Sequence, residues 1–152
     1  MKLKAVRIYI GSKPGAWEDT PFGPDVLVPK VGKKMFAIVA WKADPLRISL
    51  KGDPFLNEML REKYDAVIPG YHLNKKHWNT VILDGSVPDR EVKDWIDASY
   101  DLVAGSLTRK EHDALKLPPS YSTAERDSGP IAPKPVARAR DVALRRLWPV
   151  FR

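Results

Sequence analysis

The chain of 152 residues is the size of one domain and is long enough to bury a hydrophobic core. Its hydrophobic content of 43% and charged content of 30% exclude a disordered or membrane-embedded chain, and the absence of cysteine excludes disulfides, thiolate metal sites and cysteine nucleophiles. The net charge of +7 favours nucleic acids, anionic membranes or acidic proteins as partners without distinguishing among them.

The first predicted element is a short amphipathic helix over residues 3–10, where apolar side chains recur at helical spacing until Gly11. Residues 14–24 contain too much proline and glycine for regular structure, so we expect a loop there. Trp17 and Phe22 are expected to pin this loop to the body of the protein.

Two β-prone runs at residues 25–31 and 34–42 predict a hairpin with its turn at Gly32. Proline cannot donate to a β-ladder, so Pro29 predicts that the first strand lies at a sheet edge or is bulged there. The run at residues 46–51 alternates apolar and polar side chains without exception, which predicts a strand with one buried face. Its open face would carry Arg47, Ser49 and Lys51.

Asp53 followed by Pro54 is typical of a helix start, and the apolar spacing after them predicts a helix that ends near Tyr64. Two further strands are predicted at residues 67–73 and 78–83.

Ser86 and Asp89 resemble a capping box before the strongest helical pattern of the chain, which extends from Val92 to Val103. The complete order is α-β-β-β-α-β-β-α. It predicts an α+β fold of the two-layer sandwich type, in which one antiparallel five-stranded sheet carries helices on one face.

We expect residues 1–107 to form the α+β domain and residues 108–152 to form a C-terminal extension rich in proline and arginine. The first part holds 16 Lys and Arg against 14 Asp and Glu, and the extension holds 10 against 5. The extension has four arginines that are candidate nucleic-acid contacts: Arg138, Arg140, Arg145 and Arg146. Its apolar residues favour docking on the chain's own core or on a second subunit instead: Leu144, Leu147, Trp148, Val150 and Phe151.

Lysines occupy the turns of both predicted hairpins, with Lys33 and Lys34 in one and Lys75 and Lys76 in the other. Such corners suit phosphate binding, because cationic side chains release counterions and fix orientation without reading bases. The alternative is that lysines occupy these turns only because turns are solvated. The full candidate surface for nucleic acid is Lys33, Lys34, Arg47, Lys51, Asn74, Lys75, Lys76, His77 and Asn79.

Motifs for other chemistry are missing from the sequence. His72 and His77 lack the spacing of metal ligands, and residues 11–15 lack the spacing of a phosphate-binding loop. There is also no Gly-x-Ser-x-Gly elbow. We therefore expect a protein that is not an enzyme and that uses no metal and no cofactor.

Five segments, in this order, resemble the MmcQ/YjbR family of small bacterial proteins: residues 12–19, 21–26, 31–37, 45–51 and 70–81. The resemblance covers about residues 5–105. It implies a fold similar to type III secretion chaperones and bacterial frataxin-like proteins. It also implies DNA binding, because the family's sheet and hairpins resemble a double wing. Pro29 and the C-terminal extension depart from the family pattern.

The resemblance and the basic corners together predict a protein that binds duplex DNA with weak sequence preference. The rival is an adaptor whose sheet accepts a peptide or a second copy of the chain, using the strand of Pro29 and the extension as contacts. Salt separates the two, since phosphate binding weakens steeply with ionic strength. No segment reaches the roughly 20 apolar residues of a membrane span, and no signal peptide is evident, so we expect a cytoplasmic protein that does not bind membranes.

Overall fold

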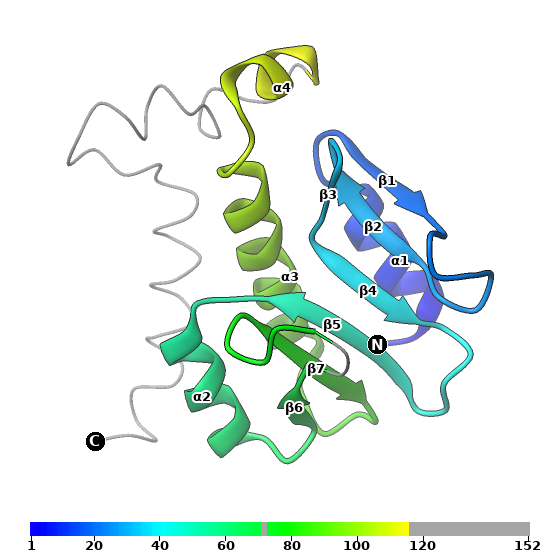
Figure 1. The fold of residues 1–152 in the computed structure, drawn as a ribbon. Coiled ribbons are helices and arrows are strands. Elements are labelled where there is room, and N and C mark those ends of the chain that lie inside the picture. Colours follow the sequence, from blue (N-terminus) through cyan, green and yellow to red (C-terminus); the bar gives the residue numbers. More distant parts are fainter. Residues whose placement is uncertain (71–72, 116–152) are drawn as a thin grey trace.

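The computed structural model describes residues 1–70 and 73–115 (Figure 1). In chain order the elements are α1 (Leu3–Gly11), β1 (Ala16–Asp19), β2 (Val28–Val31), β3 (Lys34–Met35), β4 (Ala37–Ala40), β5 (Leu46–Lys51), α2 (Pro54–Lys63), β6 (Val67–Pro69), β7 (Trp78–Leu83), α3 (Asp89–Ala104) and α4 (Arg109–Ala114). Within this part of the chain no helix has the length and apolar character needed to cross a bilayer.

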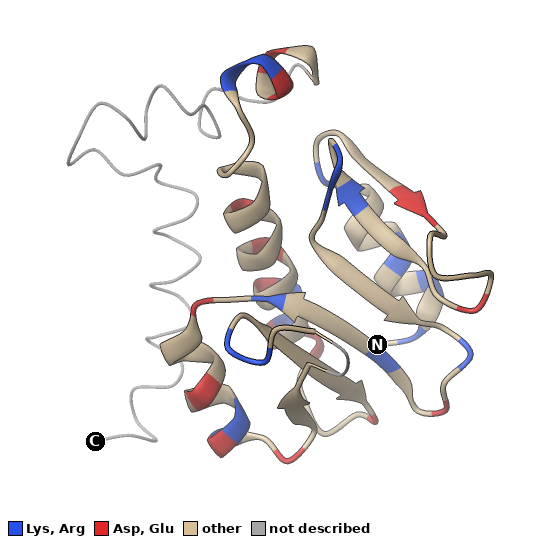
Figure 2. Cartoon of the chain, viewed as in Figure 1, with Lys and Arg blue, Asp and Glu red and all other residues tan. Residues whose placement is uncertain are grey.

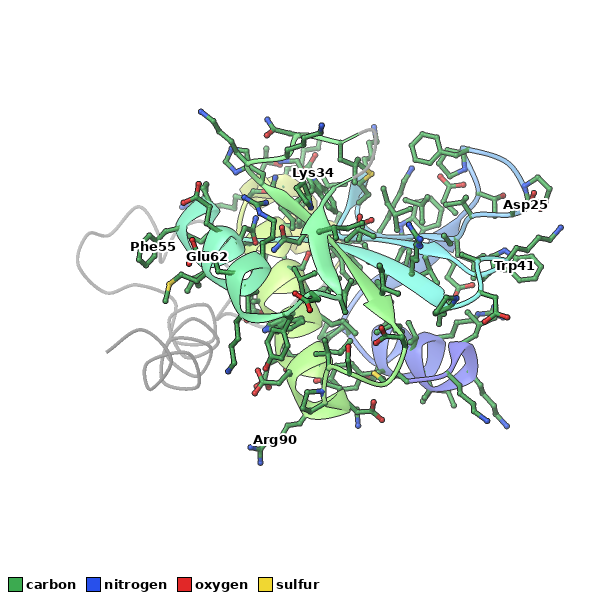
Figure 3. The ribbon with its side chains drawn as sticks, turned by 90° about the horizontal axis from the view of Figure 1, so that it is seen from below. Asp25, Lys34, Trp41, Phe55, Glu62 and Arg90 are labelled. Atoms are coloured by element: carbon green, nitrogen blue, oxygen red, sulfur yellow. The ribbon has the colours of Figure 1, made fainter. Side chains whose placement is uncertain are left out.

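The strands form two antiparallel sheets, one in the order β1-β2-β3 and the other in the order β4-β5-β7-β6. The sheets meet where the backbones of Leu27 and Val39 exchange hydrogen bonds of 3.0 and 2.8 Å. Figures 1 and 3 show α1 and α3 on the same side of the strands. The core fills this side, where the ring of Phe36 meets that of Tyr100 edge-on at 5.3 Å. The predicted α+β class is therefore confirmed.

The prediction of a single five-stranded sheet is wrong in strand count, for two local reasons. Residues 14–24 are not all loop, because β1 pairs along its whole length with β2. The predicted strand 34–42 is split at Phe36 into β3 and β4. The second predicted hairpin also differs, because its first strand, β6, ends at Pro69.

Pro29 accounts for the break at Phe36. The Phe36 N–H donates to the Pro29 carbonyl at 3.0 Å, but proline has no N–H with which to return the bond. The Phe36 carbonyl instead accepts a 2.5 Å hydrogen bond from the Ser99 hydroxyl on α3. The Ser99 oxygen in turn accepts from the Lys51 N–H at 2.9 Å. Pro29 thus lies in the central strand of its sheet and not at an edge. The other predicted alternative, a bulge, agrees with the register, which shifts by one residue between the Lys30–Met35 pair and the Leu27–Val39 pair.

The expectations for Ser49 and Phe22 also differ from the structure, whereas the expectation for Trp17 is confirmed. Ser49 is buried and its hydroxyl hydrogen-bonds to that of Thr80 at 2.8 Å, so it is not open to a ligand. Trp17 does fasten its segment, since its indole N–H donates to the Gly32 carbonyl at 2.8 Å. Phe22 does not, because 61% of it is exposed.

The start of α3 also differs from the prediction. Ser86 bonds to Asp84 rather than capping α3, whose N-cap is Pro88 without a side-chain hydrogen bond. A true capping box joins Thr108 and Glu111 at α4, with bonds of 2.9 and 3.2 Å. The division of the chain after residue 107 stays a prediction, as only residues 108–115 of the extension are described.

Candidate nucleic-acid interface

The strand registers bring lysines from both hairpins to one end of the sheets. Lys51 lies opposite Trp78 in the β5–β7 pair, and Trp78 follows Lys76 by two residues. On the other side of β5, Ala37 pairs with Leu50, which places Phe36 beside Lys51. Phe36 follows Lys34 by two residues. Because paired strands lie about 4.8 Å apart, Phe36, Lys51 and Trp78 lie within about 10 Å of one another, and the lysines of the two corners lie two or three residues beyond them. We call the lysines at this end of the sheets the basic edge: Lys33, Lys34, Lys51, Lys75 and Lys76 (Figure 2).

The first corner is the turn between β2 and β3. Gly32 adopts a φ of +63°, which favours glycine, and its carbonyl receives the bond from Trp17. Lys33 is exposed at the turn. Lys34 reaches back to the end of α3, where its ammonium donates to the carbonyl and the hydroxyl of Ser106 at 3.1 and 3.2 Å. The first corner therefore offers Lys33 fully and Lys34 in part.

The second corner is residues 73–77. The side-chain oxygen of Asn74 accepts from the Lys76 N–H at 3.0 Å, and its carbonyl accepts from the N–H groups of His77 and Trp78 at 3.1 and 2.9 Å. Asn74 thus shapes the turn. The side chains of Lys75, Lys76 and His77 are exposed.

Two residues of α2 fasten this corner through the carbonyl groups of its lysines. Arg61 donates to the Lys75 carbonyl at 3.0 Å. The Asn57 side-chain amide donates to the Lys76 carbonyl at 3.0 Å and to the Gly52 carbonyl at 3.3 Å. The backbone of the corner is therefore fixed while its lysine side chains stay in solvent, where they can contact an anion such as phosphate.

Asn79 differs from the expectation that it would face a ligand. It lies on the helix-facing side of β7 and is buried. Its amide group donates to the Asn57 carbonyl at 3.2 Å, and its side-chain oxygen accepts from Arg61 at 2.9 Å. It supports the second corner from inside, and its burial removes it from the surface that could contact phosphate.

Arg47 is exposed on the same face of β5 as Lys51 but lies four residues before it. At about 3.3 Å per residue the two positions are about 13 Å apart. Arg47 is thus a separate cation at the far end of the strand.

Lys30 is a further cation on the strands, but it is neutralised. Its ammonium lies 2.7 Å from Asp19, and this hydrogen bond from Lys30 is the main cause that holds the pKa of the Asp19 carboxyl below its usual value. Residues 1–115 hold 18 Lys and Arg against 16 Asp and Glu. The basic edge is therefore a local excess of positive charge rather than a sign of a basic domain.

The remaining candidates from the sequence are a metal site, which we do not expect, and residues that the structure does not describe. Among residues 1–70 and 73–115, no three His, Asp or Glu side chains converge where a metal ion could be held. His72 and the arginines of the extension lie outside the described residues: Arg138, Arg140, Arg145 and Arg146.

Sequence reasoning found the lysines of the corners from their turns, but it missed Asn57 and Arg61. One signal could have shown them: Asn57 lies on the buried, otherwise apolar side of α2, and Arg61 follows it by four residues, which is helical spacing. Their partners lie 14 to 19 residues away, which local patterns do not report.

Comparisons with known proteins agree with this fold. The YjbR family model matches residues 11–102. The chain is 36% identical over 115 residues to the uncharacterized protein YjbR of Escherichia coli K12, covering 76% of this chain and 98% of that protein. It is 32% identical over 96 residues to the uncharacterized protein YbdF of Escherichia coli O157:H7, covering 63% of this chain and 79% of that one.

Two solved structures extend the comparison. The crystal structure of Deinococcus radiodurans protein DR2400, a DUF419 domain, has a TM-score of 0.72 and 41% identity, and the match covers 77% of this chain and 89% of that one. A protein from Pseudomonas syringae has a TM-score of 0.60 and 29% identity, over 68% of this chain and 99% of the other.

Proposed function

This chain belongs to the YjbR family, and from its surface we propose that it binds duplex DNA through phosphate contacts made by the basic edge. The observation that carries the proposal is the row of lysines that the strand registers bring together from two hairpins and β5. The proposal involves no catalytic step, and it requires a compartment that contains DNA, such as the cytoplasm.

The geometry supports contact with phosphates and little contact with bases. Lys33, Lys75 and Lys76 are exposed, and hydrogen bonds hold the backbone of both corners. Each DNA strand carries a phosphate about every 3.4 Å along the axis, so an edge several strands wide faces more than one phosphate. Contacts of this kind position a protein without reading the sequence. Arg47 is placed to add one contact further along the face.

The test is a fluorescence-anisotropy titration of a random-sequence duplex at several salt concentrations with the full chain. We expect a dissociation constant of about 1 to 100 μM that rises steeply with salt. In the double variant Lys75→Ala/Lys76→Ala, binding should weaken for every sequence, and the slope of log K against log salt should flatten by about 1 to 2.

The matched control is Lys2→Ala/Lys4→Ala, which removes the same charge at α1, away from the basic edge. It should leave the slope nearly unchanged. An equal change in both double variants would show that only net charge matters, and an unchanged slope in Lys75→Ala/Lys76→Ala would remove the corner from the interface. Replacing the four extension arginines by alanine tests that candidate contact in the same assay.

An adaptor role is the second candidate, and β1 favours it. β1 is an edge strand, and Glu18 lies opposite Pro29, whose carbonyl points toward β3. The N–H and carbonyl of Glu18 therefore point away from β2, as strand addition requires. Ile8 is 64% exposed and Trp17 46% exposed beside an open groove of about 600 Å³. A peptide or a second copy bound there would be nearly insensitive to salt.

A further inference from the structure

A crevice lies between α2, α3 and the helix-facing side of β5 and β7, behind the second corner. Its walls are mostly apolar, and they include Leu50, Leu60, Val81, Ala98 and Leu102. Its volume is about 50 Å³. A cavity of about 150 Å³ holds the six carbon atoms of benzene, so in proportion this crevice encloses about two non-hydrogen atoms, such as a carbonyl group, and the rest of a ligand would lie at its opening.

Trp95, in the wall of the crevice, has a buried hydrogen-bond donor without a partner in the described part of the chain. The residue lines the crevice and is only 6% exposed, and its ring packs against that of Tyr64 at 5.6 Å. Its indole N–H is buried and has no hydrogen-bond partner among the residues that the structure describes. Buried indole groups almost always have an acceptor, because an unsatisfied donor in an apolar site is costly. An acceptor oxygen in the crevice would satisfy this N–H.

The asparagines that line the crevice are the ones that support the second corner. Asn57, Asn79 and Gly52 all line the crevice. The same residues form the hydrogen bonds that hold the carbonyl of Lys76 and position Arg61 beneath Lys75. A molecule in the crevice would touch the groups that fix the corner.

We propose that the crevice binds a small carbonyl-bearing molecule, with its oxygen on the Trp95 N–H and its carbon chain between Leu60 and Leu102, and that its binding changes the second corner. The ligand would thus act on the basic edge, the surface proposed above to bind DNA. Its relevance to DNA rests on the proposed function, but its binding and its effect on the corner do not.

The test uses two-dimensional ¹⁵N–¹H spectra of the full chain titrated with methyl ethyl ketone and, separately, with butyrate. We expect the Trp95 indole resonance to move downfield, as it does on gaining an acceptor, with a dissociation constant on the order of 1 mM for so small a ligand. The backbone resonances of Lys75 and Lys76 should shift with the same concentration dependence. A response to the ketone alone assigns a neutral ligand, and a stronger response to butyrate assigns a carboxylate.

Two variants make the test specific. Ala98→Leu fills the crevice and should weaken binding about tenfold or more with no loss of thermal stability. Trp95→Phe removes the donor, keeps an aromatic ring and should weaken binding about fivefold. It carries the test if Ala98→Leu does not fold.

Several results would overturn the inference. A Trp95 resonance unmoved by either probe removes the ligand site, and so does binding that neither variant weakens. Movement of Trp95 while the resonances of Lys75 and Lys76 stay in place removes the link to the corner. None of these spectra contains DNA, so a failure here is distinct from failure of the DNA titration.

Discussion

Replacing Ser99 by alanine is expected to lower the free energy of unfolding by about 2–4 kcal/mol. The loss comes from two backbone groups rather than from the hydroxyl itself. The Phe36 carbonyl loses its 2.5 Å donor, and the Lys51 N–H loses its 2.9 Å acceptor. Each unsatisfied group in a buried position costs about 1–3 kcal/mol. Urea unfolding followed by far-UV circular dichroism measures the change.

Ser12→Ala is the matched control for Ser99→Ala, because the Ser12 hydroxyl also donates to a backbone carbonyl but is exposed. It should change stability by no more than about 0.5 kcal/mol. An equal loss in the two variants would contradict the bridging role of Ser99.

Pro29 allows a sharper test of the same contact. Pro29→Ala restores the backbone N–H that a regular ladder would direct to the Phe36 carbonyl. In the wild-type chain this carbonyl already has Ser99, so the new N–H adds little. In the Ser99→Ala chain it should recover about 1 kcal/mol, seen as a coupling energy in the double-mutant cycle. Additive effects of the two substitutions would show that the Phe36 carbonyl does not need a donor.

The second large effect is expected at the support of the second corner. Asn57→Ala removes the bonds to the carbonyl groups of Gly52 and Lys76 and should destabilise the protein by about 1–3 kcal/mol. Hydrogen exchange at the amides of His77 and Trp78 should accelerate, since the corner loses one of its two attachments to α2. Glu58→Ala, an exposed neighbour on α2, is the control and should leave both quantities nearly unchanged.

Gly52 and Asn57 should also show strong coupling. A methyl group at Gly52 would overlap the side-chain oxygen of Asn57, so Gly52→Ala is expected to displace that amide from the corner. In the Asn57→Ala background the same methyl has room, and the second substitution should cost little. Equal costs of Gly52→Ala in both backgrounds would contradict this account.

Elements whose signal is local were predictable from the sequence. The alternation of residues 46–51 predicted β5 with the bounds that the structure shows. Asp53 with Pro54 predicted the start of α2, where the Asp53 carboxylate accepts from the N–H of Phe55 at 3.0 Å. The capping box at Thr108 is also a local signal, a threonine with glutamate three residues later, but no helix was predicted there.

What depends on distant partners was not predictable. β1 exists because β2 pairs with it, and the glycines and prolines on both sides of it hide the short strand. Pro29 is tolerated in a central strand because Ser99, 63 residues after Phe36 in the sequence, supplies the missing donor to that residue. In the candidate site the lysines follow from turn composition. Their support by Asn57 and Arg61, and the burial of Asn79, follow only from the packing of α2 on β7.

The two hydrogen bonds of Ser99 have a consequence for the DNA that such a protein would prefer. The first corner belongs to one sheet and the second corner to the other. Ser99 on α3 links the two sheets, because its hydroxyl bonds to Phe36 at the break between β3 and β4 and to Lys51 of β5. If the chain binds DNA as proposed, the two corners would contact phosphates at a fixed distance from each other, so that affinity would depend on the width of a groove rather than on base identity. Duplexes with narrow-groove A-tracts should therefore differ in affinity from mixed sequences, and Ser99→Ala should reduce that difference. Equal affinities of the wild-type chain for both duplexes would show that the span is not fixed.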